Sequence, residues 1–146
     1  MRLTQFTDNA LRCLLYLGVQ DERASAVSEI AQAMHCSEDH LGKVVQRLAY
    51  HGYVQTTRGR SGGVRLGKPP SEIVIGSVVR HMEADFSLVA CFDPEASPCP
   101  IAGVCHLTGV LDGALAAFFR VLDERTLEDA LGTGRSLRRV LAVTSS

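Results

Sequence analysis

With 146 residues, of which 46% are apolar, the chain is long enough to bury one core but too short for two large domains. It contains no run of the roughly 20 apolar residues that a membrane helix requires, and its N-terminus lacks the apolar segment of a secretory signal. Five cysteines, an odd number, disfavour a closed set of disulfides, so we expect a cytoplasmic protein with no membrane partner.

The net charge of −1 conceals an uneven distribution. Residues 1–80 carry 10 Lys and Arg against 7 Asp and Glu, a balance of +3, whereas residues 81–146 carry 5 against 9, a balance of −4. Residues 40–68 contain no acid but six cations: Lys43, Arg47, Arg58, Arg60, Arg65 and Lys68. Such a basic stripe is typical of proteins that bind the phosphate backbone of nucleic acids.

The first part of the chain predicts a helix-turn-helix. A helix over residues 4–20 and a short helix over 29–35 precede a third helix at about 38–51, for which Ser37 is a good N-cap. The expected buried face of the third helix consists of Leu41, Val44, Val45 and Leu48. Two short helices joined by a tight turn, the second with polar and basic residues opposite its apolar stripe, form the helix-turn-helix arrangement.

The segment that follows predicts a β-hairpin wing. Residues 53–57 and 64–66 alternate as short strands do, and residues 58–63, Arg-Gly-Arg-Ser-Gly-Gly, form a glycine-rich turn between them. The turn places Arg58 and Arg60 at the tip of the wing, where arginine suits a narrow, A/T-rich minor groove.

The outward face of the third helix supplies further candidate DNA contacts. With the N-cap they are Ser37, His40, Lys43, Gln46 and Arg47. Lys43 and Arg47 suit guanine edges or phosphates, and Gln46 suits adenine. Together with the wing, this face predicts binding to a double-stranded DNA operator.

Three cysteines, Cys91, Cys99 and Cys105, fall in one loop that is rich in Pro, Gly, Asp and Ser and follows a helix expected over residues 72–84. Clustered thiolates favour a soft metal or an iron–sulfur cluster. The spacings of seven and five residues lack the close pairs of zinc fingers, and three thiolates leave a tetrahedral site one ligand short. An iron–sulfur cluster, a zinc site and a thiol–disulfide switch all stay open.

Beyond the loop, residues 108–124 predict an amphipathic helix that pairs with its copy in a homodimer, followed by a short helix at 127–131. The fold class is therefore mostly α with a small β-hairpin: a winged helix-turn-helix domain plus a long dimerisation helix. The expected divisions are a DNA-binding domain at 1–80, a cluster-binding loop region at 81–107, the dimerisation and terminal helices at 108–131, and a flexible tail at 132–146.

The remaining cysteines and histidines give no sign of catalysis. Cys13 lies in an apolar helix and Cys36 in the expected turn, where buried structural cysteines are common. The five histidines are scattered, and the chain has no H-E-x-x-H, G-x-S-x-G or P-loop motif, so we do not expect an enzyme.

Three segments carry a resemblance to a known family: residues 1–12 (MRLTQFTDNALR), residues 58–66 (RGRSGGVRL) of the wing, and residues 97–105 (SPCPIAGVC) followed by Leu107. In this order and spacing, the chain resembles the bacterial winged-helix iron–sulfur transcriptional repressors of the Rrf-two type, and in particular their NsrR-like, nitric-oxide-sensing branch. The resemblance covers residues 1 to about 131.

The resemblance implies a nitric-oxide-sensitive repressor that binds DNA as a homodimer with an intact cluster and releases it when the cluster is nitrosylated or lost. By the same resemblance Cys91, Cys99 and Cys105 are the thiolate ligands, and Asp8 of the partner subunit is the fourth ligand. Relatives similar to IscR use a histidine in the loop region, which makes His106 the alternative fourth ligand. A 4Fe-4S cluster is expected, with a 2Fe-2S cluster as the alternative. The alternative functions are a regulator that senses cluster supply or redox state, and a zinc- or thiol-controlled regulator.

Overall fold

The computed structural model describes residues 1–93, 95–96 and 99–142. Its elements follow the order α1 (Gln5–Gly18), α2 (Val27–Ala33), α3 (Glu38–Tyr50), β1 (Val54–Thr57), β2 (Gly63–Leu66), η1 (Pro70–Glu72), α4 (Ile75–Met82), η2 (Ala90–Phe92), α5 (Leu107–Asp123), α6 (Leu127–Leu131) and α7 (Arg135–Ala142). The expected mostly helical fold with one hairpin is confirmed. Within the described residues, no helix has both the length and the hydropathy needed to cross a bilayer.

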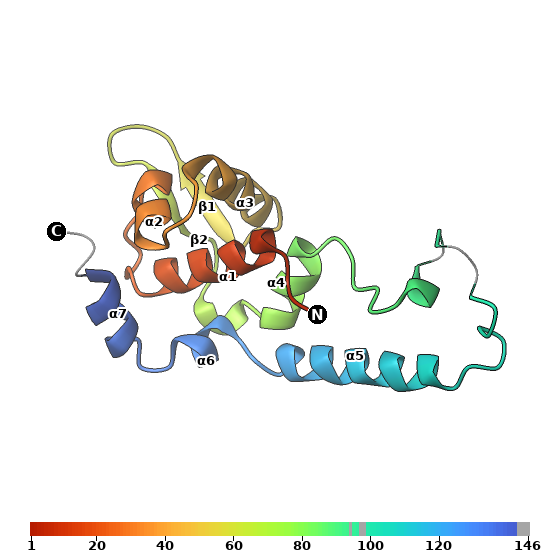
Figure 1. Cartoon of the computed structure of the whole chain (residues 1–146). Coiled ribbons are helices and arrows are strands. Elements are labelled where there is room, and N and C mark those ends of the chain that lie inside the picture. Colours follow the sequence, from red (N-terminus) through yellow and green to blue (C-terminus); the bar gives the residue numbers. More distant parts are fainter. Residues whose placement is uncertain (94, 97–98, 143–146) are drawn as a thin grey trace.

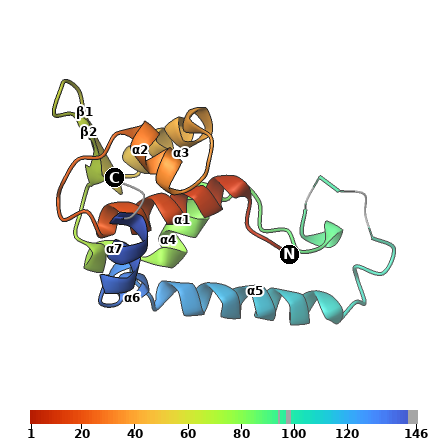
Figure 2. The ribbon, with the colours of Figure 1, turned by 60° about the vertical axis from the view of Figure 1, so that its left-hand side comes forward.

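One globular body contains α1 to α4, the hairpin, α6 and α7, while α5 projects from it (Figure 1). The described parts of the segment between α4 and α5, which include the three clustered cysteines, lie beside the outer end of α5, away from the body. Figure 2, turned by 60°, shows the same separation. The cysteine segment and the recognition helix α3 are therefore far apart within one protomer.

The helix-turn-helix is built as its local sequence predicts. The Ser37 hydroxyl accepts a hydrogen bond from the His40 backbone N–H at 3.4 Å, so the predicted N-cap of α3 is confirmed. The predicted apolar stripe of α3 is buried at all four positions: Leu41, Val44, Val45 and Leu48. Because α3 packs this stripe against α1 and α2, its polar face is left on the outside of the body.

The wing is an antiparallel hairpin that is anchored to the body. β1 pairs with β2 so that Val54 lies opposite Leu66. The backbone of Ser25, between α1 and α2, exchanges hydrogen bonds of 2.8 and 2.9 Å with Val64. At Gly63, whose φ is +151°, a Cβ atom would lie 2.7 Å from the Ser25 carbonyl oxygen, so this close approach requires glycine.

The segment before α4 differs from the prediction. The sequence predicts a helix over residues 72–84, but α4 begins only at Ile75. The Ile75 N–H donates to the Arg125 carbonyl at 2.9 Å, and the Leu127 N–H donates to the Ile73 carbonyl at 2.8 Å. These bonds pair the residues before α4 with the start of α6, and local periodicity carries no sign of this long-range contact.

The predicted flexible tail is wrong in part, because Arg135–Ala142 forms the helix α7. Arg138 holds this helix on the body: its Nε donates to the Val19 carbonyl at 3.1 Å, and its guanidinium pairs with the Asp21 carboxylate. Residues 143–146 of the predicted tail lie outside the described residues.

Candidate metal centre and nucleic-acid interface

The polar face of α3 presents four of its five candidate DNA contacts to solvent: Ser37, Lys43, Gln46 and Arg47. His40 behaves differently. Its ring stands edge-on to Phe6 with the centroids 5.8 Å apart. Its Nε2 atom is buried and has no hydrogen-bond partner within the described part of the chain. The structure thus turns His40 toward α1 and leaves the other four side chains outward.

The wing adds two cations to the same surface. Arg58 and Arg60 are both exposed in the turn between β1 and β2. Gly59 between them has a φ of +102°, in the left-handed region that glycine favours, so the turn depends on this residue. We call this predicted set, Ser37, Lys43, Gln46, Arg47, Arg58 and Arg60, the DNA-binding face. Its four cations favour contact with phosphates. Glu38 and Asp39, in the first turn of α3, are also exposed.

The three clustered cysteines are free thiols in the segment between α4 and α5. Cys91 is exposed in η2, and Cys99 and Cys105 are half-buried. Among the described residues, no group of three or more Cys, His, Asp or Glu side chains is gathered closely enough to hold a metal ion. Pro94, Ser97 and Pro98 of this segment lie outside the described residues.

The chemistry of Cys105 nevertheless fits a metal ligand. It precedes the first turn of α5, and hydrogen bonds from the backbone and hydroxyl of Thr108 and the backbone of Leu107 lower the pKa of its thiol. A helix N-terminus stabilises a thiolate in this way, and the thiolate is the form that binds metal. His106, in the N-cap position of α5, is also exposed. The donor set therefore suits a soft metal or an iron–sulfur cluster.

Asp8 lies in the first turn of α1 and is exposed. Its carboxylate pairs with Arg12, with Nη1 and Oδ2 3.3 Å apart. Arg12 in turn donates from Nη2 to the carbonyl of Met34 at 2.8 Å, in the turn between α2 and α3. Sequence reasoning missed Arg12, although its spacing of four residues from Asp8 is a detectable helical signal. The pair connects the candidate oxygen ligand to the helix-turn-helix.

The other two cysteines are placed as structural residues. Cys13 is fully buried in the core, and burial, with a smaller effect of nearby Cys36, raises the pKa of its thiol to about 12. Burial also raises the pKa of the half-buried Cys36. Both groups are thus held as neutral thiols, which are poor metal ligands and poor nucleophiles.

Comparison with known proteins identifies the family. The sequence profile of Rrf2, described as iron-dependent transcriptional regulators, matches residues 3–133. The chain belongs to the Rrf2 family. This confirms the predicted resemblance, and because the relatives are transcriptional regulators, the chain is a regulator and not an enzyme.

Two curated relatives span nearly the whole chain. This chain is 49% identical to the HTH-type transcriptional regulator NsrR of Geobacillus kaustophilus over 142 residues, which is 97% of both chains. It is 44% identical to the regulator of the same name from Bacillus subtilis, again over 97% of both.

Solved structures agree on the fold. The IscR structure from T. potens superposes with a TM-score of 0.73 at 21% identity, covering 92% of this chain and 88% of that one. The structure of CymR, the global cysteine regulator of B. subtilis, superposes with a TM-score of 0.68 at 28% identity, covering 89% and 95%. The winged-helix architecture is thereby confirmed.

Proposed function

We propose that this regulator is a repressor that binds its operator as a homodimer while it holds an iron–sulfur cluster, and releases the operator when nitric oxide destroys that cluster. The observation that carries the proposal is the full-length similarity to regulators named NsrR, at 49% and 44% identity, in a chain whose three clustered thiols are free. The protein would act in the cytoplasm.

Cys91, Cys99 and Cys105 would hold the cluster, and Asp8 of the partner subunit would supply the fourth ligand. We propose a 4Fe-4S cluster, with a 2Fe-2S cluster as the alternative. When bound, such a cluster supplies iron at which nitric oxide displaces protein ligands, and a carboxylate is a weaker ligand of that iron than a thiolate. No protomer gathers these groups by itself among its described residues, and we propose that the cluster forms where the cysteine segment of one subunit meets Asp8 of the other.

Asp8 is the residue whose contacts would differ between the two states of the proposed switch. In the structure its carboxylate pairs with Arg12 at 3.3 Å, and Arg12 also binds the Met34 carbonyl at 2.8 Å. Ligation of iron would withdraw negative charge from this carboxylate and so weaken its ion pair with Arg12. Ligand loss would therefore return Asp8 to Arg12 and alter the interactions of Arg12 at the turn before α3, which is the free-energy difference between two states that a switch requires.

The dimer would form through α5. This helix, whose residues are all described, contains no buried side chain within the protomer, and Leu107, Val110 and Val121 are each more than half exposed. An apolar helix of this kind is stable in water when a second copy covers it. Two copies would present two DNA-binding faces to the two halves of a palindromic operator.

The first test is the metal content of protein purified without oxygen. We expect brown protein that contains iron and sulfide and binds operator DNA, and loss of binding when nitric oxide is added. Cys36→Ala should keep the iron, because the half-buried Cys36 is no ligand, whereas Cys99→Ala should lose it. Colourless protein that contains zinc would contradict the proposal and favour a zinc regulator. An iron-containing protein whose DNA binding ignores nitric oxide would favour a sensor of cluster supply or redox state.

A further inference from the structure

Four consecutive residues at the end of α4 contact four other elements of the fold and the core. Arg80 binds α5, His81 binds the end of α3 and the start of the wing, Met82 is buried in the core, and Glu83 binds the start of α1. We call residues 80–83 the α4 hub. A point at which so many elements meet is well placed to transmit a displacement of one of them to the others.

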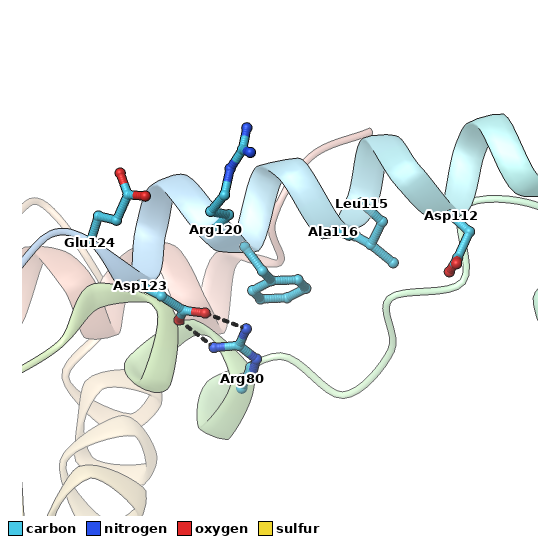
Figure 3. A pocket seen from close by; sticks show the side chains of 8 residues that line it. Arg80, Asp112, Leu115, Ala116, Arg120, Asp123 and Glu124 are labelled. Carbon is cyan, nitrogen blue, oxygen red and sulfur yellow. Dashed lines mark hydrogen bonds and ion pairs between the residues drawn. The ribbon is translucent and has the colours of Figure 1, made fainter.

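The first contact of the α4 hub is a two-pronged ion pair with α5 (Figure 3). Arg80 donates from Nη1 to Oδ1 of Asp123 at 2.5 Å and from Nη2 to Oδ2 at 2.8 Å. A Cβ atom at Gly76, one turn earlier on α4, would collide with the Asp123 carboxylate, so a larger residue there would displace this side chain. A paired guanidinium and carboxylate fix both distance and angle, which a single hydrogen bond does not.

An aromatic contact extends this ion pair toward the cysteine segment. The Arg80 guanidinium carbon lies 4.1 Å from the centre of the Phe119 ring on α5. Phe119 also contacts Phe86, whose ring stands edge-on to it with the centroids 4.8 Å apart. Phe86 belongs to the segment that leads to Cys91. Arg80 thus contacts α5 directly and, through Phe119, is linked to the approach to the proposed cluster ligands.

His81 connects the α4 hub to the recognition helix. Its ring stacks on that of His51, directly after α3, with the centroids 4.0 Å apart and the planes within 11°. Its Nδ1 atom lies 2.8 Å from the hydroxyl oxygen of Tyr53, a buried residue at the start of the wing. A movement of α4 at this point would displace the residues at the end of α3 and at the base of the wing.

Glu83 connects the α4 hub to the start of α1. Its Oε2 atom accepts hydrogen bonds from the Thr7 hydroxyl at 2.7 Å, the Thr4 backbone N–H at 3.0 Å and the Thr4 hydroxyl at 3.1 Å. Asp8 follows Thr7 directly. The start of α1, which carries the proposed oxygen ligand, and the helix proposed for dimerisation therefore both contact the α4 hub.

We propose that the α4 hub is the positioning element that transmits the placement of α5 and of the cysteine segment to α3, and that Arg80 with Asp123 is its decisive contact. The inference rests on the proposed function, because it assigns the residues through which the state of the cluster would reach the DNA-binding face. α5 packs on α4 more than on any other element, so its position is set mainly there.

The Arg80–Asp123 ion pair is better suited to fixing the position of α5 than to stabilising the fold. Its two side chains are 42% and 43% exposed, and exposed ion pairs contribute little to folding. Its removal should therefore leave the protein folded while α5 loses its fixed angle on α4. This separates a positioning role from a structural one and makes Arg80→Gln an informative variant.

The control is Arg138→Gln, which removes another exposed arginine–aspartate pair, with Asp21, together with a hydrogen bond to the Val19 carbonyl, at a site away from the α4 hub. For wild type and both variants, operator affinity is measured with the cluster bound and after nitric oxide. We expect the ratio of the two dissociation constants to fall about fivefold or more in Arg80→Gln, because the cluster-bound form loses affinity. Iron content and dimerisation should be unchanged, and Arg138→Gln should keep the wild-type ratio.

A second readout needs neither cluster nor nitric oxide. Amide hydrogen exchange of the cluster-free proteins should be faster at the end of α3, near His51, in Arg80→Gln but not in Arg138→Gln. Unchanged exchange there, or an unchanged affinity ratio in Arg80→Gln, overturns the inference. If operator binding by the wild type does not respond to nitric oxide, the proposed function is refuted. Hydrogen exchange would still test whether the α4 hub couples α5 to α3.

Discussion

Replacing Glu83 by alanine should destabilise the protein markedly, although Glu83 touches neither DNA nor the proposed cluster ligands. Its carboxylate is 9% exposed and accepts three hydrogen bonds through one oxygen, from Thr4 and Thr7 at the start of α1. Hydrogen bonds to a charged group contribute about 1.5–3 kcal/mol each, but three that share one acceptor are not additive. Because the change also removes the stronger acceptor of the fully buried Thr7 hydroxyl and leaves it a contact of 3.2 Å with the Thr4 hydroxyl, we expect a loss of about 3 kcal/mol.

For a domain of this size, such a loss corresponds to a fall in Tm of about 6–12 °C. The assay is thermal unfolding of the cluster-free proteins followed by circular dichroism, which keeps metal binding out of the comparison. Glu83→Gln is the matched control: it keeps an acceptor oxygen but loses the charge, so it should fall by less than half as much. A Tm for Glu83→Ala within about 1 °C of the wild type would refute the conclusion that this carboxylate holds α1 to α4.

Three further predictions concern DNA binding, pH and assembly. Arg60→Ala should weaken operator binding in fluorescence anisotropy and reduce the slope of log affinity against log salt by about 0.9, and an unchanged slope would exclude a phosphate contact at the wing tip. Burial and the neighbouring His81 and Arg47 lower the pKa of His51 below its ordinary value of 6.5, so the folded state binds this proton less readily than the unfolded chain. The free energy of unfolding should therefore decrease as pH falls below about 6.5. The difference between the free energies of unfolding measured by chemical denaturation at about pH 7.5 and at about pH 5.5 should be smaller for His51→Gln than for the wild type. Val110→Glu, at a position on α5 that is 66% exposed, should give folded monomers in light scattering, and an intact dimer would place the interface elsewhere.

Local sequence signals predicted the elements that local interactions determine. The α3 helix is an example: its N-cap at Ser37 is confirmed, and its four predicted apolar positions are all buried. Both features depend on residues within one or two turns of each other. The wing was predicted for the same reason, since a glycine-rich turn between two alternating segments is a short-range pattern.

The differences from the prediction all arise from contacts between residues far apart in the chain. α4 begins later in the chain than predicted because residues 73–75 pair with the start of α6. α7 forms on the body because Arg138 binds the Val19 carbonyl and the Asp21 carboxylate. His40 was expected to face DNA because of its position on the helix, but its ring packs against Phe6 of α1.

The candidate site was predictable only as a set of residue types. The thiols could be found from their spacing and from family resemblance, whereas the α4 hub has no sequence signature. Arg80 and Asp123 are 43 positions apart, and nothing near either residue indicates the other. The carboxylate of Glu83 likewise binds Thr4 and Thr7, which are 79 and 76 positions earlier in the chain.

Operator affinity before and after nitric oxide, compared between wild type, Cys99→Ala and Cys36→Ala at equal protein concentration, tests the central proposal most directly. We predict tight binding that nitric oxide abolishes in the wild type and in Cys36→Ala, and weak binding without any response in Cys99→Ala. An iron-free Cys99→Ala protein that still binds the operator tightly and still releases it on exposure to nitric oxide would contradict the proposal.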